Sequence, residues 1–138
     1  MSRMLMKSFL RSAAFLLLVG HDAVAQSLPP VNLSPVVPSG VKWQLAFVSV
    51  LNPDCSSAGE IEVRMVRSPK NGTVEIENGF GYPNYDEKNQ RYSCNTRLVQ
   101  GVRISYTSAE GFTGKDHFDL DLFALSADVI WKYSVTVK

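Results

Sequence analysis

The sequence predicts an all-β fold, an antiparallel sandwich or barrel, and three observations lead to this prediction. Apolar and polar residues alternate over several short segments, which is the period of a strand with one face on a core. Turn-forming Gly, Pro, Asn and Asp residues separate these segments. No segment keeps apolar residues at the helical period over three turns. We therefore expect about five or six short strands in one domain.

The first strands are predicted within residues 41–77. Residues 41–51 are rich in β-branched and aromatic side chains, and residues 60–67 and 73–77 alternate strictly. Between the last two, Asn71-Gly72 predicts a two-residue hairpin, because both residues accept positive φ. The residues expected to face the core here are Ile61, Val63, Met65, Val74 and Ile76.

Three further strands are predicted after a long polar stretch. Residues 78–97 hold glycines, asparagines and one proline, and form the longest loop-like segment. Strands are expected at residues 102–106, 118–122 and 129–137. Their predicted core side chains are Val102, Ile104, Tyr106, Phe118, Leu120, Leu122, Trp131, Tyr133, Val135 and Val137.

Residues 1–25 are predicted to be a cleavable signal peptide. Three basic residues precede an apolar run at residues 13–19, and the small-x-small pattern Ala23-Val24-Ala25 ends the segment. A permanent membrane anchor is the alternative, but a spanning helix needs about 20 apolar residues, more than this run supplies. We expect a periplasmic or secreted protein without a stable membrane anchor.

Removing the signal peptide would leave 113 residues, enough for one domain. Cleavage takes three of 14 basic and one of 13 acidic residues, leaving 11 and 12, a net charge of −1. The basic residues are scattered, so a nucleic-acid partner is not expected. Residues 26–40 hold four prolines and are predicted to be a leader or linker, or a strand along an edge. The sandwich domain is expected at residues 41–138.

Cys55 and Cys94 are the two cysteines of the chain. In an oxidising compartment, a pair in a small domain is most simply a disulfide. A catalytic thiol or a metal-ligand pair is the alternative. A metal site needs further Cys or His ligands, and His117 is the one histidine after residue 25, so neither a metal nor another cofactor is expected.

Three motifs in order resemble those of the bacterial immunoglobulin-like or cadherin-like repeats. They are Pro69-Lys70-Asn71-Gly72-Thr73-Val74, Val102-x-Ile104-x-Tyr106 and the segment from Gly111 to Phe118. The resemblance covers about residues 60–138 and implies an immunoglobulin-like β-sandwich used for display, adhesion or spacing. The chain departs from these repeats in its single copy, its cysteine pair and its long polar insert between Ile76 and Leu98.

The Gly111–Phe118 segment has a structural explanation that needs no chemistry. Gly111 and Gly114 permit backbone angles closed to other residues, and Asp116 can bond backbone amides in a tight corner. Phe112 and Phe118 are expected to plug the end of the sandwich.

No catalytic constellation is recognisable in the sequence, and we predict that the protein is not an enzyme. His117 could pair with a neighbouring aspartate, but alternation places it opposite Phe118, on the solvent side. Asp116, Asp119 and Asp121 could contribute to a calcium site, which needs about six to eight oxygen ligands. A solvated acidic strip is the alternative for these carboxylates.

The predicted function is a non-catalytic interaction, structural or adhesive module. The alternative is an accessory or inhibitor that binds another exported protein through the loop at residues 78–97. Exposed tyrosines among small polar residues suit recognition, although the same rings could pack over the disulfide. The candidate binding residues are Phe80, Tyr82, Tyr85 and Tyr92.

Overall fold

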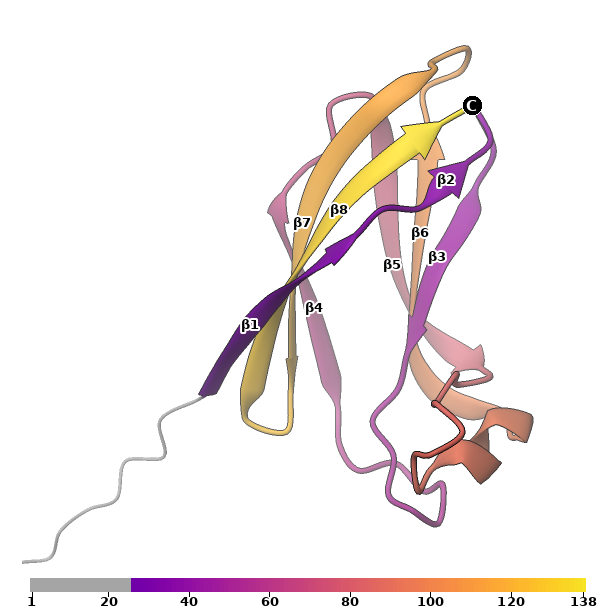
Figure 1. The fold of residues 1–138 in the computed structure, drawn as a ribbon, viewed down its shortest axis with the longest axis vertical. Coiled ribbons are helices and arrows are strands. Elements are labelled where there is room, and N and C mark those ends of the chain that lie inside the picture. Colours follow the sequence, from indigo (N-terminus) through magenta and orange to yellow (C-terminus); the bar gives the residue numbers. More distant parts are fainter. Residues whose placement is uncertain (1–25) are drawn as a thin grey trace, which may run out of the picture.

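The computed structural model describes residues 26–138, and the predicted signal peptide lies outside them. The strands form two sheets, and Figure 1 labels them in chain order. They are β1 (Gln26–Leu33), β2 (Val36–Val37), β3 (Trp43–Val48), β4 (Ile61–Arg67), β5 (Gly72–Gly81), β6 (Val99–Ser108), β7 (Gly114–Ala124) and β8 (Ala127–Val137), with a short 3-10 helix η1 (Tyr92–Thr96). The predicted all-β class is confirmed. Among the described residues, no helix is long and apolar enough to cross a membrane.

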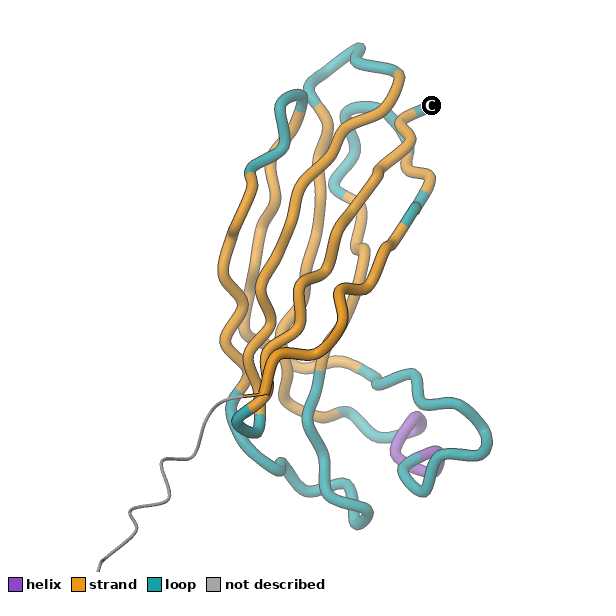
Figure 2. Tube along the Cα trace, turned by 60° about the vertical axis from the view of Figure 1, so that its left-hand side comes forward, coloured by secondary structure: helices purple, strands orange, loops and turns teal. Residues whose placement is uncertain are grey.

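The two sheets face each other over most of their length (Figure 2). The first sheet has the order β1-β8-β7-β4, with β2 also paired to β8, and the second has the order β3-β6-β5. All pairs are antiparallel except those of β1 and β2, which run parallel to β8. The fold is therefore mixed at one edge, where the sequence predicts an antiparallel arrangement throughout.

Alternating side chains from both sheets form the main core. Ile104 and Tyr106 enter it from β6, and Phe118, Leu120 and Val135 enter it from the first sheet, all without exposed surface. The ring of Phe118 stacks on Tyr133 with centroids 4.6 Å apart and on Tyr106 at 5.9 Å. Such aromatic contacts add stability beyond the area they bury. The predicted inward faces of β6, β7 and β8 are confirmed at these positions.

The proline-rich segment at residues 26–40 lies against the domain as an edge. Its strands β1 and β2 pair with β8, so the first sheet begins at Gln26, before the expected domain boundary at Val41. The register shifts between Leu28 and Val31, where Pro29 and Pro30 supply no amide hydrogens. This edge position tolerates prolines because one side of the strand needs no partner.

The prediction of a hairpin at Asn71-Gly72 is wrong. Strands β4 and β5 belong to different sheets, and the chain crosses between them at residues 68–71. Gly72 serves close packing instead, because a Cβ atom there would lie 2.5 Å from the carbonyl oxygen of Thr107. The tight hairpin lies between β7 and β8, where Leu125 and Ser126 have φ values of 52° and 63°.

Two residues predicted to be buried are substantially exposed. Met65 and Ile76 pair with Leu120 and Ile104, so they do lie on the core side of their strands. Their exposed fractions are nevertheless 37% and 36%. Strands β4 and β5 are edge strands of their sheets, and an edge position leaves one flank of an inward side chain uncovered.

Candidate binding site

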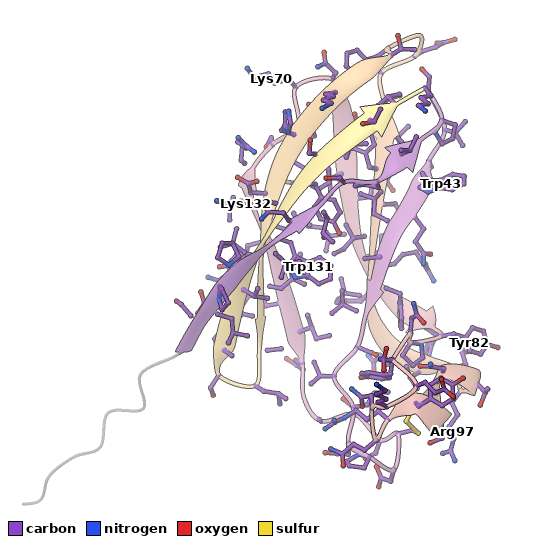
Figure 3. All side chains as sticks on the ribbon, viewed as in Figure 1. Trp43, Lys70, Tyr82, Arg97, Trp131 and Lys132 are labelled. Atoms are coloured by element: carbon purple, nitrogen blue, oxygen red, sulfur yellow. A yellow bond between two sulfur atoms is a disulfide. The ribbon has the colours of Figure 1, made fainter. Side chains whose placement is uncertain are left out.

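The polar insert and the β3–β4 loop form a projecting lobe at one end of the sandwich. We call residues 82–98 together with residues 49–60 the disulfide lobe. In Figure 3 the labelled side chains of Tyr82 and Arg97 stand on this lobe and point away from the sheets. Strand β5 continues to Gly81, so Phe80 lies on a strand and not in the predicted loop.

A disulfide closes the lobe, as the sequence predicts. Cys55 and Cys94 are bonded with their Cα atoms 5.5 Å apart. Cys55 sits in a tight turn with φ of 71°, and its amide donates to the carbonyl oxygen of Asn52 at 2.9 Å. Within the turn, the hydroxyl and amide of Ser56 donate to Asp54 and lower the pKa of its carboxyl group. The turn therefore fixes the position from which the disulfide reaches the insert.

A second, smaller core lies beneath the lobe. Leu51, Cys94 and Val99 are buried in it, and Phe47 and Tyr85 pack against them. The ring of Phe47 lies so close to two glycines that a Cβ atom at Gly81 or Gly101 would come within about 2.8 Å of it. Val99 alternates with the main-core residues of β6, so this small core lies on the outer face of the second sheet.

Hydrogen bonds hold the backbone of the insert in one conformation. The amide of Tyr85 donates to Oδ1 of Asn95 at 2.8 Å, and the Asn95 side-chain amide returns a bond to the Tyr85 carbonyl at 2.9 Å. Arg91 donates from Nε to the Leu51 carbonyl, which ties the insert to the β3–β4 loop. Tyr85 thus packs against the core that contains Cys94. This is the second of the two roles that the sequence offers for the aromatic residues of the insert.

Three other aromatic rings remain on the surface. The exposed fractions are 61% for Phe80, 61% for Tyr82 and 50% for Tyr92, and Leu98 on the lobe is also exposed. Phe80 is the last but one residue of β5, and Tyr92 opens η1. Their backbones therefore belong to ordered elements anchored to the sheet or the disulfide, while their rings face solvent.

A cleft of about 620 Å³ opens between the sheets next to the lobe. Figure 2 shows that the two strands leading into the lobe bend away from the first sheet at this end. One wall is the β3–β4 loop up to Glu60 together with Ile61 at the start of β4, and the other wall is formed by β5 and β6 with Asn78, Gln100 and Val102. The cleft is thus continuous with the strand that carries Phe80.

The predicted structural corner lies at the opposite end. Gly111 and Gly114 have φ values of 74° and 126°, which favour glycine. Phe112 packs at the margin of the main core, and Phe118 lies inside it without exposed surface. Phe118 therefore occupies the centre of the aromatic stack, deeper than the end position that the sequence suggests.

Asp116 is buried in this corner as an acceptor of four hydrogen bonds. The amides of Lys70 and His117 donate to Oδ1, and the Asn71 amide and the Tyr106 hydroxyl donate to Oδ2, all at 2.9 Å. Burial acts to raise the pKa of Asp116, but these donors outweigh it and hold the pKa below its ordinary value. The carboxylate is a charged structural link among β6, β7 and the β4–β5 crossing.

The other titratable residues singled out by sequence do not converge on a reaction centre. His117 is exposed, and Asp119 pairs with Arg67 at 3.1 Å. Oδ1 of Asp121 is buried without a hydrogen-bond partner among residues 26–138. Within that range, no three His, Cys, Asp or Glu side chains are grouped to hold a metal ion. None of these residues lies on the disulfide lobe.

Comparisons with known proteins assign neither a family nor a function. No family model and no curated protein matches the chain. The solution structure of Amebosin has a TM-score of 0.43 and 15% identity, covering 82% of this chain and 97% of that one. The structure of PbICP-C in complex with falcipain-2 has a TM-score of 0.38 and 10% identity, covering 83% and 92%.

Proposed function

We propose that this domain is a non-catalytic binding module that recognises another exported protein through the disulfide lobe and the adjoining end of β5, which carries Phe80. The observation that carries the proposal is the set of three exposed rings, Phe80, Tyr82 and Tyr92, on a backbone fixed by a disulfide and by hydrogen bonds. Aromatic side chains provide large contact area for little loss of conformational freedom. A rigid backbone lowers the entropic cost of association further.

The strand order supports an immunoglobulin-like sandwich. If the strands are lettered in sequence, with β1 and β2 together as A and β8 as G, one sheet holds A, C, F and G. The other holds B, D and E. The separation of B, D and E from C, F and G is the arrangement of immunoglobulin domains. Such sandwiches commonly present binding loops at their ends, as the disulfide lobe does here.

Export is the second part of the proposal. The predicted signal peptide at residues 1–25 would deliver the chain to an oxidising compartment, and the bond between Cys55 and Cys94 forms readily there. A non-catalytic role is supported by the distribution of polar residues. The carboxylate of Asp116 accepts four hydrogen bonds from groups of the fold. His117 and Asp119 lie on the solvent side of β7, far along the strand from the lobe.

The experiment is affinity capture from periplasmic extract with the mature domain as bait. We expect one partner in stoichiometric amount with the wild-type domain. The Tyr82→Ser/Tyr92→Ser double variant should lose it, because both rings leave the proposed contact surface. Trp43→Ser is the matched control, since Trp43 is an exposed aromatic residue away from the lobe (Figure 3). The proposal fails if no stoichiometric partner is captured or if the double variant captures it equally well.

A further inference from the structure

We propose that the end of the sandwich opposite the disulfide lobe holds a second binding site, which takes a phosphate monoester. A pocket of about 350 Å³ lies there, between the β4–β5 crossing and the start of β7. Its lining includes the cationic side chains of Arg67, Lys70 and Lys115 and the imidazole of His117. The site goes beyond the proposed function, because none of these residues lies on the disulfide lobe.

A β-bulge in β4 places one of the cations at this pocket. The register shifts between Met65 and Arg67, where Val66 is the extra residue. The shift pairs Arg67 with Asp119; without it, Arg67 would lie opposite Phe118 and point into the core. Bulges often re-aim a side chain next to a functional site. Here the bulge turns the guanidinium to the outer face of the first sheet.

Asp116 holds the other side of the pocket in place. Its carboxylate accepts the amides of Lys70 and Asn71 at 2.9 Å, which fixes the crossing beside β7. Lys115 and His117 flank Asp116 on β7 and are exposed, so both side chains point to the outer face. Side chains from β4, the crossing and β7 therefore meet on a backbone that is set before a ligand binds. Such preorganisation lowers the entropic cost of binding.

The charge at the pocket stays positive after its own acids are counted. The three cations of the lining are joined by Lys132, which lies directly across from Asp119 on β8. Asp119 pairs with Arg67, and the buried Asp116 lines the pocket, so four positive and two negative charges leave a balance of +2. Within residues 26–138, the three lysines form no ion pair. Figure 3 shows Lys70 and Lys132 on one side of the molecule, away from the disulfide lobe.

Other acidic side chains lie too far away to cancel this charge. The backbone of Glu110 lies beside Gly40, at the edge of the first sheet away from β4. Asp121 lies four residues along β7 from His117, about 13 Å at the rise of a strand. That distance exceeds the Debye length of about 8 Å at physiological salt. The basic area ends there, so it suits a single phosphate group and not a nucleic-acid backbone, which needs a longer basic surface.

A phosphate monoester matches these donors better than a carboxylate does. It carries about 1.5 to 2 negative charges at neutral pH and three acceptor oxygens. The guanidinium of Arg67 presents a planar fork of donors that fits phosphate, and Lys70 and Lys115 supply point charges. An imidazole donates from one ring nitrogen even when it is neutral, so His117 adds a further donor. The volume is at the lower end of the range for small-molecule sites, which suits a small phosphorylated group.

Titration of the mature domain with glycerol 3-phosphate tests the site. Amide chemical shifts in NMR spectra report where the probe binds. We expect saturable shifts at residues 67–71 and 115–117, and none at Tyr82 or Tyr92 on the lobe. Acetate has one charge and two oxygens, and over the same concentrations it should give no saturable shift.

Two double variants with the same net charge separate the pocket from general attraction. Lys70→Gln/Lys115→Gln removes two cations from the pocket and should weaken binding of glycerol 3-phosphate at least about tenfold. Lys88→Gln/Arg97→Gln removes two exposed cations from the lobe and should bind like the wild type. Circular dichroism establishes that both variants are folded, which the exposure of all four side chains favours.

Vesicles distinguish a lipid head group from a soluble ligand. Sedimentation is compared for phosphatidylcholine vesicles with and without phosphatidic acid, whose head group is a phosphate monoester. Binding to phosphatidic acid that Lys70→Gln/Lys115→Gln abolishes would identify a lipid source, and binding of glycerol 3-phosphate alone would identify a soluble one. The inference is overturned if both probes fail to bind, if the shifts do not saturate or lie elsewhere, or if the two double variants bind alike. Partner capture by the disulfide lobe is independent of all these results.

Discussion

The hydroxyl of Tyr106 donates a hydrogen bond to Oδ2 of Asp116 at 2.9 Å inside the sandwich. Tyr106 belongs to β6 of the second sheet, and Asp116 belongs to β7 of the first. The bond therefore links the two sheets directly. The same carboxylate accepts amides from the crossing between β4 and β5, so one side chain joins both sheets to the loop that connects them.

Tyr106→Phe should destabilise the fold, whereas Tyr133→Phe should not. Both rings are buried and stack on Phe118. The Tyr106 hydroxyl bonds to Asp116, while the Tyr133 hydroxyl has no partner among the described residues. We expect a loss of about 1–3 kcal/mol for Tyr106→Phe, because the bond is to a charged group, and about zero for Tyr133→Phe. Urea unfolding measures both values, and equal losses would contradict the difference assigned to Asp116.

Stability should fall in acid through Asp116. Because the pKa of this carboxyl group is lower in the fold than its ordinary value of 3.8, its contribution is fully present above that value. It is lost as the pH falls below 3.8 towards the folded pKa, where the native state must also take up the proton. The free energy of unfolding, followed from neutral pH into this range, should therefore drop more steeply in the wild type than in Asp116→Asn.

Asp119→Asn is the control for that acid titration. Asp119 lies on the same strand but forms only a surface pair with Arg67, and such pairs contribute little. The free energy of unfolding of Asp119→Asn should therefore fall with decreasing pH as it does in the wild type. A wild-type slope in Asp116→Asn would mean that other carboxylates carry the acid sensitivity.

Alternation predicts the faces of strands well and their partners poorly. Phe118, Leu120 and Leu122 are buried as the period-two pattern requires. The same pattern contains nothing about which sheet a strand joins, so the crossing at residues 68–71 resembles a hairpin in sequence. The true hairpin uses Leu125 and Ser126 at positive φ, and neither residue type marks such a turn.

The candidate site was predictable in composition but not in geometry. Tyrosines among small polar residues indicate a recognition surface, and the exposure of Tyr82 and Tyr92 fits that pattern. Tyr85 has the same local sequence character, yet it packs beneath the lobe because Asn95, ten residues later, brackets its backbone. The cleft depends on how two sheets diverge, which involves residues distant in sequence and leaves no local signal.

Gly101→Ala should destabilise the fold by about 2–4 kcal/mol. A Cβ atom there would lie 2.3 Å from the Val48 carbonyl oxygen and 2.7 Å from the Phe47 ring, so the backbone of β3 would have to move. Gly79→Ala is the matched control on the neighbouring strand, where the nearest atom is the flexible Arg103 side chain at 3.8 Å. Thermal unfolding should leave Gly79→Ala within about 1 kcal/mol of the wild type. Similar losses in both would contradict the close approach at Gly101.

Replacing both cysteines, Cys55→Ser/Cys94→Ser, should loosen the disulfide lobe before the sandwich. The bond closes a loop between residues 39 positions apart, and its removal should lower the free energy of unfolding by about 4 kcal/mol in the chain-entropy model. The main core contains neither cysteine, because its residues come from the two sheets. We therefore expect faster amide exchange at Tyr85, Asn95 and Arg97, with Tyr133 and Val135 still protected.

The same double variant tests whether the disulfide serves binding as well as stability. If the lobe presents its rings in a fixed arrangement, Cys55→Ser/Cys94→Ser should lose partner capture at temperatures where circular dichroism still shows a folded sandwich, because ordering the lobe then opposes binding. Tyr133→Phe, whose fold and lobe stay intact, controls for handling of the bait. Full capture by the unbridged variant, with exchange of the lobe amides accelerated, would show that the partner does not need a rigid lobe.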